Sequence, residues 1–270
     1  MDFLARDTVS FSEDFWENID NAVVSTVRAN LIGRRFLSLY GPLGAGVLSV
    51  NIDSTDSAEE ADNGFIKTSG RKFVELPQIY EDFTLNWRDI EYSKASGIPL
   101  DLTKVRQAAQ KIALKEDTLI FFGNEFLGAE GLLTAEGAVK MQKSDWTAGD
   151  NAFRDVAAGL ARFRSKFMIG RYSLVLSPDL YVQLQHINPG LGIMEEERIS
   201  KMLNGHLYNA PVLGSNKAVL VCAEPQYMDL AIGKDIETAY LESRDLNHVF
   251  RILETAVLRI KNKEAIIIFE

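Results

Sequence analysis

The sequence feature that most constrains the fold is a helix-forming stretch between two extended segments, within residues 71–133. Apolar residues recur there in steps of three and four: Leu102, Val105, Ala109 and Ile112. This spacing predicts a helix over 101–117 with one apolar face, and Asp101 is expected to cap its start by accepting a backbone hydrogen bond. The residues before it, 71–93, are expected to be extended, and the apolar run at 118–123 is expected to be a return strand. Together these elements predict a structural spine rather than an active site.

A second amphipathic helix is expected near the N-terminus, over residues 12–31. Ser12 is followed by two acidic residues, an arrangement that suits a helix N-terminus. Apolar residues then recur along one side: Phe15, Trp16, Ile19, Val23, Val27 and Leu31. This stripe predicts that the helix packs on a core along one face.

The segment 47–73 is expected to form a long two-stranded hairpin. Its outer parts, 47–52 and 65–72, have the pattern of strands, whereas the acidic stretch 53–64 between them is expected to be a solvated loop. An isolated hairpin is only marginally stable in water. We therefore expect this arm to pack on another surface, such as that of a second subunit.

The pattern changes after residue 133, where short helices and short strands alternate. The predicted helices cover 148–167, 179–185 and 195–205, and the predicted strands cover 172–177 and 217–223. This alternation predicts an inserted α/β subdomain over about 134–224. The chain then returns to extended segments, of which the longest, 248–262, alternates apolar and polar residues as a strand does.

The composition excludes several classes of function. Lysine and arginine number 29 and aspartate and glutamate 38, so the net charge is 29 − 38 = −9, which argues against nucleic acid as the main ligand. The single cysteine, Cys222, excludes an internal disulfide and is expected to be a buried, inert thiol. No stretch has the roughly 20 apolar residues that span a membrane, and the N-terminus lacks the pattern of a secretion signal. A cytoplasmic protein without a membrane partner is therefore expected.

The inventory of catalytic motifs is nearly empty. The sequence contains no phosphate-binding P-loop, nucleophile elbow, zinc-protease motif or paired-cysteine motif. Its histidines, at 186, 206 and 248, do not have the spacing of metal ligands. Trp87 and Tyr92 lie near an arginine–aspartate pair, and aromatic rings there can stack a planar ligand, although packing is the favoured role. No catalytic residue and no metal site are assigned.

Nine short motifs occur in order along the whole chain. They are MDFLARD at 1–7, GRRF at 33–36, GP at 41–42, ELPQIYEDFTLNWRDIE at 75–91, KEDTLIFFG at 115–123, GAEGLL at 128–133, YSLVLSPDLY at 172–181, GKDIETAY at 233–240 and AIIIFE at 265–270. Taken together, their order and spacing resemble the encapsulins, which are bacterial and archaeal shell proteins with the capsid fold of the tailed phage HK97. The family-one encapsulins, which carry this N-terminal helix, are the most similar.

The resemblance implies an α+β fold of the HK97 capsid type, divided into three kinds of domain. The P-domain would comprise 1–46, 74–133 and 225–270, the E-loop 47–73 and the A-domain 134–224. In the family, E-loops pack on neighbouring subunits and A-domain loops converge at the five-fold axis. These features account for the unsupported hairpin and for the inserted subdomain.

The resemblance also implies a function without catalysis. The chain would be a structural shell protein that self-assembles into an icosahedral homo-oligomer, in multiples of 60, and encloses a cargo enzyme. Cargo in the family is often a ferritin-like iron-storage protein or a peroxidase, which implies roles in iron storage and oxidative stress. Two alternatives stay open: a phage-derived major capsid protein that packages nucleic acid, and an enzyme. The acidic composition argues against the first, and the missing nucleophile–base pair argues against the second.

Two sets of site residues follow from the resemblance. A C-terminal targeting peptide of the cargo is expected to bind at Val27, Leu31, Arg34, Leu39, Asp235 and Ile236. The alternative that Val27 and Leu31 only attach the helix to its own core stays open. The pore at the five-fold axis is expected to be lined by His186, Ile187 and Asn188, and His186 is expected to titrate near neutral pH.

The expectation for a cofactor is that flavin binds weakly or not at all. Some members of the family bind a flavin through a tryptophan on the segment that matches 83–92. Here Trp87 is shifted by one residue and Arg88 takes its place. Because neighbouring side chains of a strand point to opposite faces, this shift is expected to turn the ring away.

Overall fold

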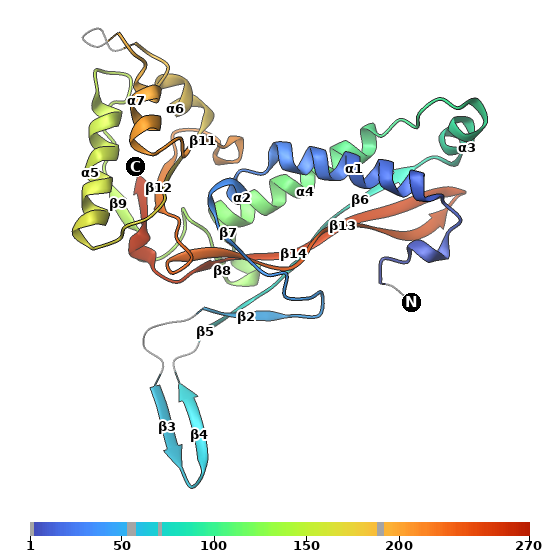
Figure 1. The fold of residues 1–270 in the computed structure, drawn as a ribbon, viewed down its shortest axis with the longest axis horizontal. Helices are drawn as coiled ribbons and strands as arrows, with labels where there is room; N and C mark the ends of the chain where they lie inside the picture. Colours follow the sequence, from blue (N-terminus) through green and yellow to red (C-terminus); the bar gives the residue numbers. More distant parts are fainter. Residues whose placement is uncertain (1–2, 53–57, 70–71, 188–191) are drawn as a thin grey trace.

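The computed structural model describes residues 3–52, 58–69, 72–187 and 192–270. Figure 1 shows two lobes side by side and a thin arm that projects away from both. The first lobe consists of two long helices packed on long strands, and the second is built from shorter helices around a smaller sheet (Figure 1). This division gives the molecule one extended lobe, one compact lobe and an arm with little core.

The extended lobe, here called the spine lobe, is organised on a four-stranded sheet. Its strand order is β1 (Leu39–Tyr40), β13 (Met228–Arg244), β14 (Asn247–Ile260) and β6 (Gln78–Leu85). The strands β13 and β14 pair in antiparallel fashion from Met228 opposite Ile260 to Arg244 opposite Asn247, with three register shifts on the way. Two helices, α1 (Glu13–Asn30) and α4 (Thr103–Phe122), pack against each other over this sheet (Figure 1).

The prediction of the N-terminal helix is confirmed almost to the residue. The side chain of Ser12 accepts a hydrogen bond from the backbone N–H of Phe15 and so caps α1. The residues Ile19, Val23 and Val27 are buried, as the apolar stripe predicts. A short helix, α2 (Gly33–Phe36), follows after a sharp turn at Leu31 and Ile32.

The predicted return strand at 118–123 is wrong, because these residues continue the helix α4 to Phe122. Leu119, Ile120 and Phe121 are buried, and a short apolar run has the same sequence pattern in a fully buried helix as in a buried strand. The helix ends at Gly123, which has φ +68° and leaves no room for a Cβ atom, since that atom would lie 2.1 Å from the carbonyl oxygen of Ala129. At the other end the N-cap is Leu102, one residue after the predicted Asp101, but the Asp101 carboxylate does accept hydrogen bonds from the backbone N–H and the hydroxyl of Thr103 at the start of α4.

The extended segment predicted over 71–93 is correct only in its first part. The strand β5 (Lys72–Glu75) and the strand β6 are separated by a proline, but residues after Asn86 form the helix α3 (Trp87–Ser96). Only Ile90 of this helix is buried, and the helix ends at Gly97, with φ +71°. The expectation that Trp87 lies on a strand is therefore wrong.

The compact lobe contains a five-stranded sheet. Its order is β11 (Leu207–Asn209), β10 (Tyr172–Leu176), β12 (Ala218–Cys222), β15 (Ile266–Phe269) and β9 (Val139–Met141). Three helices belong to this lobe (Figure 1): α5 (Asn151–Ser165), α6 (Pro178–Gln183) and α7 (Glu195–Met202). The predicted helices and strands of the insertion are thus confirmed. Burial raises the pKa of the Cys222 thiol to about 11, which agrees with an inert side chain.

The last strand connects the two lobes. Residues 225–270 were expected as a single set of P-domain strands, but they contribute to both sheets: β13 and β14 belong to the spine lobe, whereas β15 pairs with β12 and β9 in the compact lobe. All four residues of β15, Ile266–Phe269, are buried. A short apolar run of this kind does not indicate which sheet the strand joins.

The arm is a ladder of two strand pairs. Near the spine lobe, β2 (Ser49–Ile52) pairs with β5, and further out β3 (Ala58–Asp62) pairs with β4 (Phe65–Ser69). The predicted hairpin is confirmed, but part of the acidic stretch expected as a loop is the strand β3. The ring of Phe65 is 80% exposed and the side chain of Ile66 is 69% exposed, so the outer pair buries little apolar surface within one subunit.

Smaller elements complete the structure. They are the strand pair β7 (Gly123–Asn124) and β8 (Ala129–Glu130) and the 3-10 turns η1 (Arg6–Thr8), η2 (Glu125–Leu127), η3 (Pro211–Leu213) and η4 (Lys263–Ala265).

Candidate functional site

Five of the six residues predicted to bind a cargo peptide line one pocket of about 340 Å³. The pocket lies where the C-terminal part of α1 and the helix α2 meet the strand β13. Its lining consists of Val24, Val27, Arg28, Leu31, Arg34, Arg35, Asp235 and Ile236. The chain therefore brings together two segments about 200 residues apart. We refer to this hollow as the α1–β13 pocket.

Leu39 is the predicted residue that does not line this pocket. It lies on β1 opposite Leu230 and is 53% exposed. Ile236 is six residues further along β13, or roughly 20 Å at the rise of a strand. The assignment of Leu39 to the same pocket is therefore not supported by its position.

The apolar wall of the pocket is shared with the core of the spine lobe. Val27 and Leu31 are almost fully buried and belong to the main hydrophobic cluster, so they attach α1 to its own core, and they line the pocket as well. Val24 is exposed and Ile236 is partly exposed, and these two side chains offer apolar surface to a ligand. Sequence reasoning missed Val24, although its spacing of three from Val27 places it on the same side of the helix.

The floor of the pocket is a network of one arginine and three carboxyl groups. The guanidinium of Arg34 donates hydrogen bonds from Nε and Nη2 to Glu116, with a shortest distance of 2.6 Å. It also donates from Nη2 to Glu254 and from Nη1 to Asp235, each at 2.6 Å. The side chains of Glu116 and Glu254 are inaccessible to solvent, whereas that of Asp235 is two-thirds exposed. Arg34 therefore joins α2, α4, β13 and β14 at one point.

The pKa values of these groups follow from this crowding. Burial and the neighbouring carboxyl group of Glu116 raise the pKa of Glu254 well above its ordinary value. Burial acts in the same direction on Asp235, but the hydrogen bond and charge of Arg34 outweigh it and lower the pKa of that carboxyl group. Burial by itself would lower the pKa of Arg34, and the contacts with Glu116, Glu254 and Asp235 raise it instead. Glu254 therefore takes up a proton more readily than an exposed glutamate does.

A further carboxyl group, that of Asp117, holds the start of α2 next to this network. Asp117 accepts hydrogen bonds from the backbone N–H groups of Ile32 and Gly33 at the start of α2. Burial raises its pKa to about 6 despite these hydrogen bonds. A Cβ atom added to Gly33 would lie 2.3 Å from the side chain of Ile120, so α2 and α4 are in direct contact here.

His186 and Ile187, two of the three predicted pore residues, follow the helix α6 in the compact lobe. His186 Nδ1 faces the carbonyl oxygen of Gln183 at 2.7 Å, and Nε2 faces that of Gly149 at 3.0 Å. The buried carboxylate of Glu195 lies 3.0 Å from Nε2 as well. These two hydrogen bonds and the charge of Glu195 raise the pKa of His186. Ile187 is exposed, and Asn188 lies outside the described residues.

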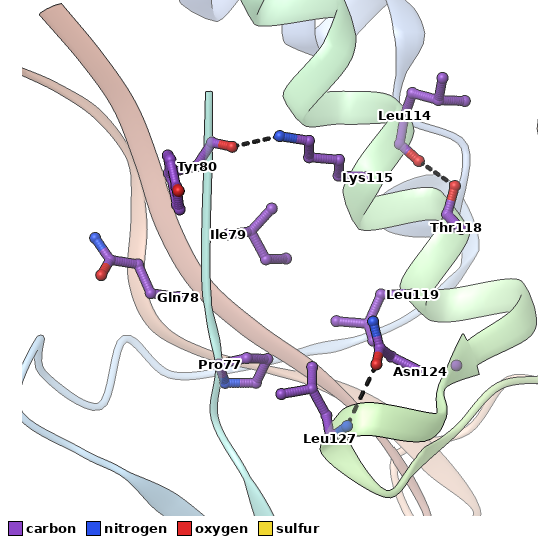
Figure 2. Close-up of a pocket in the computed structure, with 11 residues that line it drawn as sticks. Pro77, Gln78, Ile79, Tyr80, Leu114, Lys115, Thr118, Leu119, Asn124 and Leu127 are labelled. Carbon is purple, nitrogen blue, oxygen red and sulfur yellow. Dashed lines mark hydrogen bonds between the residues drawn. The ribbon is translucent and has the colours of Figure 1, made fainter. Parts of the chain in front are cut away.

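Figure 2 shows another hollow, of about 390 Å³, between β6 and α4. Lys115 donates a hydrogen bond to the carbonyl oxygen of Tyr80, and the backbone N–H of Leu127 donates to the side chain of Asn124. Most of the lining is apolar, and Lys115 is its only ionisable side chain besides the tyrosine. The arrangement contains no nucleophile beside a base, so it has no evident catalytic chemistry.

Trp87, the residue considered for flavin binding, lies at the edge of the spine lobe on a helix (Figure 1). Trp87 is the first residue of α3, partly exposed, with the guanidinium of Arg88 5.5 Å from its ring. The argument from strand alternation against a flavin therefore no longer applies, and weak or absent flavin binding stays a prediction. Within 3–52, 58–69, 72–187 and 192–270, no group of three or more histidine, cysteine or acidic residues is arranged to hold a metal ion. Across the same ranges, no helix has the length and apolar character needed to cross a bilayer.

Comparison with known proteins identifies the family. The family model described as "Encapsulating protein for peroxidase" matches residues 1–257. The chain belongs to the encapsulin family. The type 1 encapsulin shell protein EncA of Myxococcus xanthus is 37% identical over 277 residues, which cover 100% of this chain and 96% of that protein. A diheme-cytochrome-encapsulin shell fusion protein of Kuenenia stuttgartiensis is 36% identical over 97% of this chain and 74% of its own length.

Solved structures support the encapsulin fold. The virus-like particle from Pyrococcus furiosus matches with a TM-score of 0.74 at 20% identity, over 95% of this chain and 99% of that one. The capsid of the Myoviridae phage XM1 matches with a TM-score of 0.63 at 13% identity, over 87% and 90%. The prediction of an HK97-type capsid fold of the α+β class is thus confirmed, and this encapsulin is a shell protein with a structural role.

Proposed function

We propose that this encapsulin assembles into a closed icosahedral shell, with a multiple of 60 subunits, and encloses a cargo enzyme. The arm carries this proposal, because it exposes Phe65 and Ile66 at the end of a strand pair with almost no core. Exposed apolar surface of this kind marks an interaction site, and a closed shell supplies a neighbouring subunit for every arm.

The α1–β13 pocket is the site proposed for the cargo's C-terminal targeting peptide. It combines exposed apolar side chains, Val24 and Ile236, with charged groups at its rim. Burying an aliphatic side chain of a peptide contributes roughly 1.5–3 kcal/mol if it is fully covered. The rigid floor around Arg34 keeps the two walls in place, so little ordering is needed when the peptide binds.

The nature of the cargo is proposed from relatives. A relative in Pyrococcus furiosus is named a ferritin-like-encapsulin shell fusion protein and is 28% identical over 159 residues. The description of the matching family model mentions a peroxidase as the encapsulated protein. We propose an iron-storage or peroxidase cargo. We further propose that the shell has no enzymatic activity, since the hollows described above lack a nucleophile–base pair. The domain division, the cytoplasmic location and a pore beside His186 and Ile187 belong to the same proposal.

Electron microscopy of the purified protein tests the shell, and cargo loading tests the site. We expect closed particles that retain a co-purifying protein. The variants Val24→Asp and Ile236→Asp change exposed or partly exposed side chains, and particles of both should form without cargo. Leu31→Asp is unsuitable as a test of binding, because Leu31 is buried and the change would unfold the subunit. Intact particles that keep their cargo in both variants would refute the site.

The alternative of a capsid that packages nucleic acid is favoured by the fold match to a phage capsid. Against it, the subunit carries a net charge of −9, which opposes contact with a polyanion. The ratio of absorbance at 260 and 280 nm separates the two. Particles rich in nucleic acid that resists nuclease would favour the capsid.

A further inference from the structure

The α1–β13 pocket is one half of a longer groove. A second hollow, of about 270 Å³, is lined by Leu4, Arg6, Asp20, Val23, Val24, Ile236, Glu237 and Thr238. Val24 and Ile236 line both hollows, so the two adjoin at these side chains, and we refer to them together as the groove. Along α1 the groove extends from Asp20 to Leu31, which is roughly 16 Å at the rise of a helix. An extended peptide of about five residues has this length.

The groove is bordered by residues of β13 that pair with no other strand on this side in the described part of the chain, although Nε of Arg6 donates to the carbonyl oxygen of Thr238 and the N–H of Ile236 to the Asp235 carboxylate. The strand β1 pairs with β13 only at Leu230 and Ala231, and the residues after β1 donate backbone hydrogen bonds to the carbonyls of Ile232 and Gly233. Further along, the carbonyl of Leu4 accepts from the backbone N–H of Tyr240. The groove lies beside the residues of β13 between these two contacts.

The charges differ between the two ends of the groove. At the end near Leu4, Arg6 makes a bidentate ion pair with Asp20, at 2.7 and 2.8 Å, and Glu237 is paired with Lys234 at 2.7 Å. The carboxylates of Asp20 and Glu237 are thus each paired with a cation of the same subunit. The end near Leu4 therefore offers a peptide little net charge.

At the other end two arginines have no carboxylate partner within the described part of the chain. Arg28 makes neither a hydrogen bond nor an ion pair there, and Arg35 donates one hydrogen bond, to the carbonyl oxygen of Ala29 at 2.9 Å. A guanidinium has five N–H donors, so most of theirs are free. Arg34 differs from both, because three carboxyl groups, those of Glu116, Glu254 and Asp235, take most of its donors. The pocket thus has two exposed guanidinium groups that no ion pair holds in place, although the charge of Arg28 acts on Asp235 and that of Arg35 on Asp117.

The groove also stops at this end. The chain turns from α1 into α2 at Leu31 and Ile32, and Arg34 and Arg35 of α2 form part of the lining. A bound peptide must therefore end there or leave the surface. The two arginines also offset the partial negative charge at the C-terminus of α1, which would otherwise repel an anion.

We propose that this end binds the terminal carboxylate of the docked peptide. The last residue of the cargo lies between Arg28 and Arg35, and the preceding residues extend over Val24 and Ile236 toward Leu4. Guanidinium groups suit this role, because their planar donors match the two oxygens of a carboxylate. The inference rests on the proposed function of the pocket, and it adds the direction of the peptide and the group that fixes its end.

A pair of synthetic peptides tests the direction. Their sequence is the last ten residues of the protein that co-purifies with the shells, with a fluorophore at the N-terminus and either a free terminal carboxylate or a terminal amide. We measure their binding to empty shells by fluorescence anisotropy. The amide is expected to bind roughly tenfold more weakly, because it loses charge-assisted hydrogen bonds.

The variants Arg28→Gln and Arg35→Gln, singly and together, complete the test. In the double variant the acid and the amide should bind equally, whereas the control Arg106→Gln, at an exposed position of α4, should keep the difference. Equal binding of the two peptides by the unmodified shell would overturn the inference, as would a difference that persists in the double variant. In both cases loss of binding in Ile236→Asp would still support the pocket. If Ile236→Asp binds both peptides normally, the proposed function of the pocket is itself wrong.

Discussion

The spine lobe and the arm achieve order in opposite ways. Around Arg34, four elements meet at one buried guanidinium, and every bond of that group is to the same subunit. In the outer arm, β3 and β4 pair with each other and leave Phe65 and Ile66 exposed. The lobe is thus stabilised within the subunit, whereas we propose that the arm depends on contacts with a neighbouring subunit. Changes in the lobe should affect folding, and changes in the arm should affect assembly.

The largest effect is expected from a charge on the arm. Phe65→Asp and Ile66→Asp, combined, place two carboxylates on the exposed apolar surface of β4, next to the acidic strand β3. We expect a folded subunit that forms no closed shell, measured by size-exclusion chromatography and electron microscopy. The control Lys67→Gln changes another exposed residue of β4, and this variant should assemble. Normal particles from the double variant would mean that the arm is not an interface.

The next largest effect should come from the centre of the lobe. Arg34→Met removes the cation and leaves the buried carboxyl groups of Glu116 and Glu254 without a partner. Breaking a buried ion pair in this way costs about 3–5 kcal/mol of unfolding free energy. Urea denaturation of the unassembled subunit measures this loss. A loss below about 1 kcal/mol would show that the network contributes little to folding.

A moderate, pH-dependent effect is expected at Glu254. Because the folded state raises its pKa, the stability linked to its proton is complete below the ordinary value near 4.5 and is lost as pH rises through the folded value. Glu254→Gln keeps the acceptor for Arg34 without a titrating group. The unfolding free energy of this variant should fall less between pH 5 and pH 9 than that of the unmodified chain. Identical pH profiles for the two proteins would contradict the assignment of the proton.

The smallest effect is expected at His186. Its ring nitrogens face the carbonyl oxygens of Gln183 and Gly149, which favours the doubly protonated ring and raises its pKa. The associated stability is present below the ordinary value of about 6.5 and is lost as pH rises through the folded value. Because the ring is about a quarter exposed, solvent screening keeps the effect of His186→Gln below about 1 kcal/mol. NMR titration of the ring measures the shift, and a pKa at or below 6.5 would contradict it.

Much of the fold was predictable because local patterns and tertiary packing agree. The apolar stripe and the Ser12 cap specify α1, and Pro178 and the acidic run at Glu195 mark the starts of α6 and α7. The errors occurred where the pattern carries less information. The run at 118–123 is apolar on every side, so periodicity does not distinguish a helix from a strand. At Trp87 no strong helix signal precedes α3, and the end of β6 was missed.

The sequence by itself determined the family, the two long helices, the hairpin arm and the apolar segments of the inserted lobe, because each depends on the order and spacing of nearby residues. Only the tertiary structure decided which segments meet. It placed β15 in the second sheet, joined Arg34 to Glu116, Glu254 and Asp235, which lie 82, 220 and 201 residues away in the sequence, and separated exposed Val24 from buried Val27 and Leu31. It also showed that no carboxylate pairs with Arg28 or Arg35 in the described part of the chain, whereas Arg34 pairs with three. The physical reason is that burial and charge pairing depend on neighbours in space, and the position of a residue in the chain does not specify them.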